Sequence, residues 1–292
     1  MTEKNLTYSD GVLFGFLGML GFSGTLVATR VAVVDFSALE ITCIRILIAG
    51  LMGLVVLVVT NKLAMPDRAL LLPILTMGLG LAVGYPFFLA LALKDVPAAH
   101  GAVVTGLAPA ATAIVAVIRA GERPPPAFWV ASITGFAAVL YFAYEAGGGH
   151  ISISDGWLIM GMLSLGVAYV EGGKASQSLG GTVTLSLAML ALCPFAAIAF
   201  LISTTTAQLS SASSTGWLAI TYLGVVSMFL ASVFWYRGLA VGGISRISQI
   251  NLLLPLTALG WSALFLGEQI TWTAIVCSLV VFAAMLVCLN NR

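Results

Sequence analysis

Long apolar runs alternate with short polar or proline-rich breaks along the whole chain. A helix needs about 20 predominantly apolar residues to cross the hydrocarbon core of a bilayer. Solid runs favour helices over a β-barrel, whose strands would alternate apolar and polar positions over about ten residues. The pattern therefore predicts an all-α integral membrane protein with ten spanning helices, at residues 11–29, 37–60, 69–92, 98–118, 126–144, 156–173, 183–203, 216–236, 245–266 and 271–290.

The basic residues between these runs predict the orientation of the chain, because cytoplasmic loops carry an excess of Lys and Arg. With the N-terminus inside, only Arg30 and Lys94 lie in outer loops. The opposite orientation would reverse the imbalance, so both termini are expected in the cytoplasm. The basic residues placed on the inner side are Lys4, Lys62, Arg68, Arg119, Arg123, Lys174, Arg237, Arg246 and Arg292.

Short segments recur in the same order at an offset of 145 or 146 residues, which indicates an internal duplication. The matching segments are Ser9-Asp10-Gly11 with Ser154-Asp155-Gly156, Pro109 with Pro255, Gly121-Glu122 with Gly267-Glu268, and 136–140 with 282–286. They divide the chain into domains 1–148 and 149–292. Each domain would hold five helices, and an odd number of helices places the two domains in opposite orientations.

Inverted repeats are typical of carriers, in which two related halves exchange conformations around a site near the middle of the bilayer. Alternating access is therefore the expected mechanism. A duplicated membrane scaffold without transport is the other interpretation of the same pattern.

Composition excludes several functional classes. The chain is 60% hydrophobic and 8% charged, with a net charge of +1. A soluble domain carries about 25% charged residues and could not bury this much apolar surface. These values argue against a cytosolic enzyme, a nucleic-acid partner or a disordered chain, and the expected partners are the lipid bilayer and a small-molecule substrate. The four cysteines lie in apolar runs without CxxC spacing, so we expect no disulfide, metal site or cofactor.

Polar and aromatic residues inside the predicted spans are the candidate substrate-binding residues. An amphipathic solute needs an aromatic wall for its apolar part and neutral hydrogen-bonding groups for its polar part. The candidates are Tyr85, Phe88, His100, Thr105, Tyr169, Trp235, Gln249 and Asn251. Pro86, Pro109 and Pro255 lie inside predicted helices and are candidate hinges, since proline removes a backbone hydrogen bond.

Charged residues are scarce inside the spans. Arg45 lies roughly 12 Å inside the outer end of its helix, five residues after Glu40. Glu171 and Lys174 are spaced to form a structural ion pair. No carboxylate falls at the middle of a span, where ion-coupled carriers usually place one. We therefore expect facilitated diffusion rather than tight ion coupling.

The ten helices, the two five-helix halves and the Gly-Glu pair after the fourth helix of each half resemble the drug/metabolite transporter superfamily, specifically its EamA-type exporters. The resemblance covers essentially the whole chain. Within the superfamily the chain is most similar to inner-membrane exporters of aromatic amino acids. This resemblance implies a basket-shaped bundle with a central cavity, exporting aromatic and other amino acids from a bacterial cytoplasm. Because ten helices can enclose a cavity alone, we expect one chain to be sufficient for activity.

Three alternatives stay open at this point. A proton-coupled exporter of another metabolite or drug would share the fold. The GxSG sequence at Gly21–Gly24 resembles the nucleophile motif of an intramembrane serine protease, although neither His100 nor His150 offers Ser23 a clear base. A channel is the third, but selective pores usually have repeated elements arranged around an axis.

Overall fold

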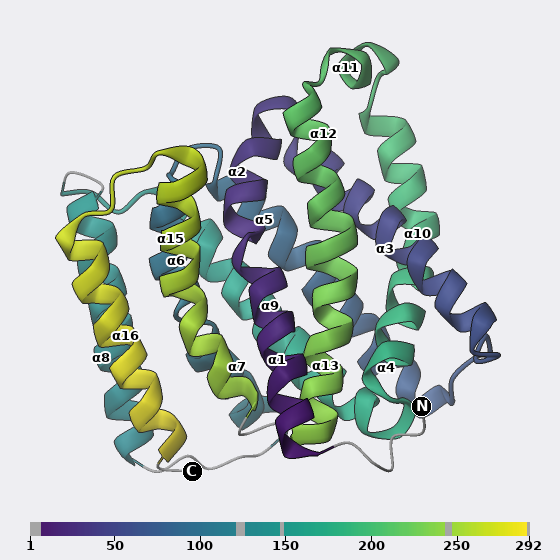
Figure 1. Cartoon of the computed structure of the whole chain (residues 1–292), viewed down its shortest axis with the longest axis horizontal. Coiled ribbons are helices and arrows are strands. Elements are labelled where there is room, and N and C mark those ends of the chain that lie inside the picture. The colour runs from purple at the N-terminus through teal and green to yellow at the C-terminus, as the bar shows by residue number, and fades with distance from the viewer. Residues whose placement is uncertain (1–6, 121–125, 147–148, 243–246, 291–292) are drawn as a thin grey trace.

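The structure is a computed structural model, and it describes residues 7–120, 126–146, 149–242 and 247–290. These residues form helices and connecting segments, without strands (Figure 1). Up to residue 146 the elements are α1 (Tyr8–Ser23), α2 (Thr25–Asp35), α3 (Ala38–Val59), α4 (Arg68–Gly78), the π-helix η2 (Leu79–Gly84), α5 (Tyr85–Ala92), α6 (Ala98–Thr105), α7 (Ala108–Ala120) and α8 (Pro126–Ala146).

After residue 146 the chain again forms long helices interrupted by short irregular segments. They are α9 (Ile153–Leu179), α10 (Gly181–Ser203), α11 (Thr206–Ser211), α12 (Ser214–Thr221), the π-helix η3 (Tyr222–Leu230), α13 (Ala231–Gly242), the 3₁₀ helix η4 (Ser248–Leu253), α15 (Leu254–Leu266) and α16 (Trp272–Asn290).

Seven helical segments within the described ranges are long and apolar enough to cross a membrane. An eighth would be the pair Ala98–Thr105 and Ala110–Arg119, which is bent by 44°. The apolar helices Leu254–Leu266 and Trp272–Ala284 are shorter than a full span. The chain is thus a multi-pass helical protein, and ten spans stays a prediction. The seven segments are Ser9–Asp35, Ala38–Val59, Arg68–Ala92, Trp129–Ala146, Ile153–Leu179, Gly181–Ser203 and Ser214–Gly238.

Two helices begin three residues before the predicted spans that start at residues 11 and 156. The carboxylate of Asp10 accepts a hydrogen bond from the Thr7 amide at 2.7 Å, and α1 begins at Tyr8. In the same way Asp155 accepts one from the Ser152 amide at 2.8 Å, and α9 begins at Ile153. The aspartate that recurs in the two halves is therefore the third residue of its helix and closes a capping box with the N-cap residue, Thr7 or Ser152.

The long helices pack in pairs that are distant in sequence. α3 lies beside α10, α1 beside α13 and α8 beside α16 (Figure 1). One buried apolar cluster joins α6, α8, α15 and α16, and another joins α3, α4, α9 and α10. The outer surface is apolar as well, with Val34, Leu201 and Ile202 each at least 77% exposed. Such a surface is stable in lipid, which solvates these side chains.

Helical irregularities recur at equivalent positions of the two sequence repeats. The π-helix η2 corresponds, at the offset of 145, to a stretch inside the π-helix η3. The break between α6 and α7 corresponds to the junction of η4 with α15. The two breaks also meet in space, because a β-carbon on Gly106 would lie 3.4 Å from Cγ of Pro255. The interrupted helices are therefore in contact at their interruptions.

Candidate functional site

Buried and half-buried polar side chains from distant parts of the chain converge inside the bundle. We call Thr25, Arg45, Tyr85, Tyr169, Ser227 and Asn251 the central polar cluster. Oγ1 of Thr25 and Oγ of Ser227 are 2.7 Å apart. Nη2 of Arg45 lies 3.5 Å from the same Ser227 oxygen. The cluster thus begins as a polar bridge from α2 and α3 to η3.

The other half of the cluster is built from tyrosines and an amide. The Tyr85 hydroxyl is close enough to Arg45 for the two groups to interact electrostatically. The Tyr169 side chain lies near those of Asn251 and Tyr85. Oδ1 of Asn251 is buried and has no hydrogen-bond partner. The arrangement can therefore offer neutral donors and acceptors, together with one guanidinium, to a bound solute.

Local backbone irregularities place these side chains. Tyr85 is the first residue after η2, and Pro86 follows it. Ser227 lies inside η3. π-helical turns are rare and often occur at functional sites, because the extra residue re-aims the neighbouring side chains. Both π-helices therefore end at or contain members of the central polar cluster.

The structure brings together three of the predicted binding residues, Tyr85, Tyr169 and Asn251. Phe88 is half-buried and stacks on Trp157, with ring centroids 5.7 Å apart. Trp235 is buried and meets Phe22 edge to face at 6.2 Å. These contacts place Phe88 toward α9 and Trp235 toward α1.

The remaining predicted binding residues have local partners or lie beyond the description. His100 is buried, with Nε2 2.6 Å from Oδ1 of Asp155 and its ring packed on Phe142. The Thr105 hydroxyl donates to the Ala102 carbonyl of its own helix at 2.8 Å. The side chain of Gln249 lies outside the described residues. Binding roles for these residues stay predictions.

The candidate hinge prolines lie at irregular points of their helices. Pro86 follows η2, and Pro255 opens α15 directly after η4. Pro109 falls in the first turn of α7, just after the break from α6, and its side chain lies outside the described residues. Pro86 lies inside the continuous apolar segment Arg68–Ala92, and Pro255 follows η4 without a gap. A hinge role for the three prolines stays a prediction.

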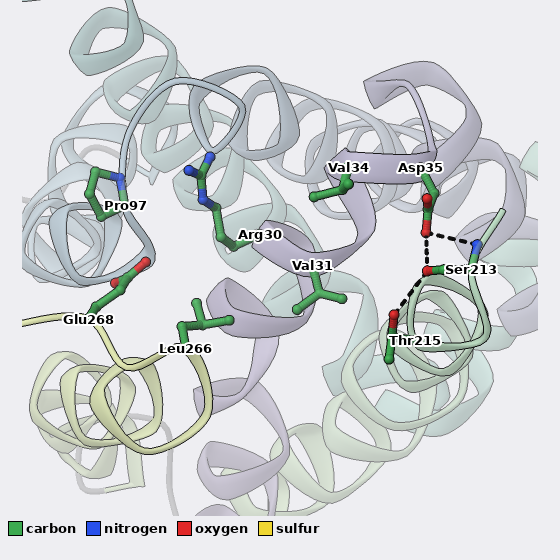
Figure 2. Close-up of a pocket in the computed structure, with 9 residues that line it drawn as sticks. All are labelled: Arg30, Val31, Val34, Asp35, Pro97, Ser213, Thr215, Leu266 and Glu268. Atoms are coloured by element: carbon green, nitrogen blue, oxygen red, sulfur yellow. Dashed lines mark hydrogen bonds between the residues drawn. The ribbon is translucent and has the colours of Figure 1, made fainter.

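A pocket of about 510 Å³ opens beside the ends of α2 and α15 (Figure 2). It is lined by Arg30, Val31, Val34, Asp35, Pro97, Ser213, Thr215, Leu266 and Glu268. We call it the outer pocket, following the predicted orientation.

Charged side chains of the outer pocket hold helix ends. The Glu268 carboxylate accepts from the amides of Ala98 and Ala99 at 2.9 and 2.7 Å, at the start of α6. Arg30 donates to the carbonyls of Leu93 and Lys94, just after α5. Asp35 accepts from the amide and hydroxyl of Ser213, just before α12 (Figure 2). The pocket is therefore a place where helix ends of distant segments meet.

The Gly-Glu pair found by sequence repetition has a structural explanation in the second half of the chain. Gly267 ends α15 in the left-handed conformation, with φ of 64°. This turn delivers Glu268 to the amides at the start of α6. The matching pair Gly121-Glu122 lies outside the described residues.

An ion-pair network lies at the other end of the bundle. Glu171 is buried, with Oε1 2.9 Å from Nη2 of Arg119 and 3.4 Å from Nζ of Lys174. The predicted pair of Glu171 with Lys174 is confirmed. Sequence spacing missed Arg119 as its closer partner, because the two residues lie on helices far apart in the chain.

Ser23, the candidate protease nucleophile, serves as a contact between helices. Its hydroxyl donates to the Leu20 carbonyl at 2.7 Å and accepts from Nε1 of Trp261 at 2.8 Å. The thiols of Cys43, Cys193 and Cys277 are free, and no group of potential metal ligands occurs within the described residues.

The long apolar helices and the apolar outer surface define a multi-pass membrane protein, and comparison with known proteins identifies its family. The EamA-like transporter family matches the chain twice, over residues 9–144 and 152–290. The uncharacterized transporter YdeK of Bacillus subtilis (strain 168) is 36% identical over 274 residues, covering 94% of each chain. The chain therefore belongs to the EamA-like transporter family of the drug/metabolite transporter superfamily.

The fold is shared with a protein of known structure. A crystal structure with 19% sequence identity covers 95% of this chain and 97% of its own, with a TM-score of 0.64. The name of the Bacillus relative specifies a transporter and no substrate. The function is therefore membrane transport, while the solute is a matter for proposal.

Proposed function

We propose that this protein exports amino acids with aromatic or other large neutral side chains across the bacterial inner membrane by alternating access, with both termini in the cytoplasm. The observation that carries the proposal is the central polar cluster. Three of its members come from α2, α3 and α5 in the first sequence repeat, and three from α9, η3 and η4 in the second. A carrier places its substrate site where its two halves meet.

The chemistry of the cluster suits a neutral amino acid. An ammonium group needs oxygen acceptors, which the hydroxyls of Tyr85 and Tyr169 and the unpartnered Oδ1 of Asn251 can provide. The apolar part of the solute needs a surface to pack against. The stacked rings of Phe88 and Trp157 lie on the same side of the bundle as Tyr85 and supply one.

Facilitated diffusion is proposed because the cluster contains no carboxylate. Glu171 already has two cationic partners. Protonation of a carboxylate is a common means of coupling solute movement to protons. A site composed of hydroxyls, an amide and a guanidinium has no such group near neutral pH.

The alternating-access mechanism assumes ten spans in two inverted halves of five. The recurrence of the π-helices and of the helix breaks at one offset supports this arrangement. The double match to the family model also supports it. Rocking of two related halves around breaks that meet at Gly106 and Pro255 would expose the cluster to each side in turn.

Counterflow in proteoliposomes tests the function. The lumen is loaded with unlabelled phenylalanine, labelled phenylalanine is added outside, and no ion gradient is imposed. Transient accumulation of label, blocked by other large neutral amino acids, is the expected result. Empty liposomes give the background.

Any other result of the counterflow experiment would change the proposed mechanism or the proposed solute. Accumulation that appears only with an imposed proton gradient would replace facilitated diffusion by a proton-coupled mechanism. Absence of counterflow under both conditions, with every amino acid tried, would overturn amino acid export and leave another metabolite as the solute.

A further inference from the structure

Arg45 is a cation buried in the outer half of a membrane helix, following the predicted orientation. It lies in α3 and is 2% exposed, among the most buried large side chains of the protein. Nε and Nη1 of its guanidinium have no hydrogen-bond partner, and Nη2 has only the 3.5 Å contact with Ser227. A guanidinium carries five N–H donors and stays charged in proteins. Most of its hydrogen-bonding capacity is therefore unused.

No carboxylate within the described residues lies within salt-bridge distance of Arg45. Glu40 is the acidic residue nearest to it in sequence, and its Oε2 accepts from the Ser37 amide to cap α3. Ser227 already pairs with Thr25. The neighbouring groups are thus neutral, and the positive charge is not balanced by the protein.

An unbalanced charge in this position is costly, because taking an ion out of water requires compensating charge or hydrogen bonds. Charged residues inside membrane proteins are rare and generally mark the path of a solute or ion. A planar guanidinium with free N–H groups matches the two oxygens of a carboxylate. The chemistry missing at Arg45 is therefore that of an anionic, bidentate acceptor.

We propose that Arg45 binds the carboxylate of the transported solute, with the Ser227 and Tyr85 hydroxyls available as additional donors. This inference rests on the proposed transport of amino acids and names the group that anchors them. The free N–H groups are the observation that distinguishes this role from a purely structural one. A structural arginine would be expected to have its donors satisfied by the protein.

The proposal defines which solutes bind. A carboxylate is required and an ammonium alone is insufficient. L-phenylalanine and 3-phenylpropanoate should both bind, whereas phenethylamine and L-phenylalaninamide, which lack the carboxylate, should not.

The test is a titration of the thermal unfolding midpoint (Tm) of the full-length protein in lipid nanodiscs with these compounds, because ligands that bind the folded state raise it. The variants are Arg45→Gln and the charge-conserving Arg45→Lys. Arg68→Gln, which removes an exposed arginine at the start of α4, is the matched control. Removing one partner of a buried charge pair costs about 2 kcal/mol or more, so Arg45→Gln should raise the half-saturating concentration of phenylalanine by a factor of at least about 30.

Arg45→Lys should weaken phenylalanine binding less than Arg45→Gln, and Arg68→Gln should leave it unchanged. If Arg45→Gln fails to fold, the Arg45→Lys variant and the ligand series on the wild type still test whether Arg45 binds the carboxylate. A merely structural Arg45 would lower Tm without changing which ligands raise it, and that result would overturn the proposal. Equal stabilisation of the wild type by phenylalanine and its amide would also overturn it.

The two proposals fail in different ways. Stabilisation by 3-phenylpropanoate without any by amino acids would uphold the role of Arg45 and refute amino acid export. Stabilisation only by phenethylamine and L-phenylalaninamide would refute the role of Arg45 and indicate an amine carrier. No stabilisation by any carboxylate would refute the anchoring role.

Discussion

Glu268 offers a sharp test of the helix-end contacts around the outer pocket. Its two oxygens accept from the amides of Ala98 and Ala99 at 2.9 and 2.7 Å, at the start of α6. Glu268→Ala removes both acceptors and the negative charge that favours a helix N-terminus. Because Glu268 is only half-buried at the end of the bundle, water can replace part of what is lost.

The cost should therefore match that of losing a helix N-cap, about 1–2 kcal/mol, rather than that of a fully buried unsatisfied pair. By the scaling of soluble proteins, this corresponds to a fall in Tm of roughly 2–8 °C. Glu268→Gln keeps one oxygen acceptor and should lose about half as much. Thermal unfolding in detergent or nanodiscs measures these shifts.

Gln269→Ala is the matched control, because Gln269 is the next residue and is exposed. Its effect should stay within about 0.5 kcal/mol, as for most surface substitutions. If Glu268→Ala behaved like Gln269→Ala, the two hydrogen bonds would contribute nothing to stability, and the explanation of the Gly-Glu pair would be wrong.

Two further substitutions test the backbone. Gly267→Ala should destabilise the protein by about 1–2 kcal/mol, since φ is positive at Gly267. Gly260→Ala inside α15 should be neutral or stabilising. At neither position would the new β-carbon meet another atom within 4 Å, so equal shifts in Tm would contradict the backbone explanation. Pro255→Ala should slow counterflow of phenylalanine if the junction of η4 with α15 is a hinge, and unchanged transport would remove that role.

The sequence predicted the membrane-spanning class well, because apolar length alone decides whether a helix can cross lipid. The helices beginning near residues 11 and 156 start three residues earlier than the apolar runs indicate, because the capping boxes place Asp10 and Asp155 inside their helices. The sequence also contained no sign of η2 and η3, since a π-turn leaves no clear pattern of residue types. Family membership followed from the Gly-Glu pairs and the repeat, and is confirmed.

The candidate site was only partly predictable. Tyr85, Tyr169 and Asn251 could be proposed because they are polar or aromatic residues inside apolar runs. Ser227 was overlooked, although its hydroxyl in a long apolar run was a usable signal. The sequence could not determine how each helix is rotated about its axis, which depends on packing against neighbouring helices. This is why the unpaired guanidinium of Arg45 became evident only in the structure.

The hydrogen bonds of Arg30, Asp35 and Glu268 to neighbouring helix ends determine the free energy needed to separate the helices at this end of the bundle. Each contact is a hydrogen bond that water can take over, so separation strands no backbone group. The net difference is about 1 kcal/mol for each bond. The six bonds together would favour the joined arrangement by about 6 kcal/mol, and a change of about 1.4 kcal/mol from one lost cap would shift the ratio of the two arrangements about tenfold.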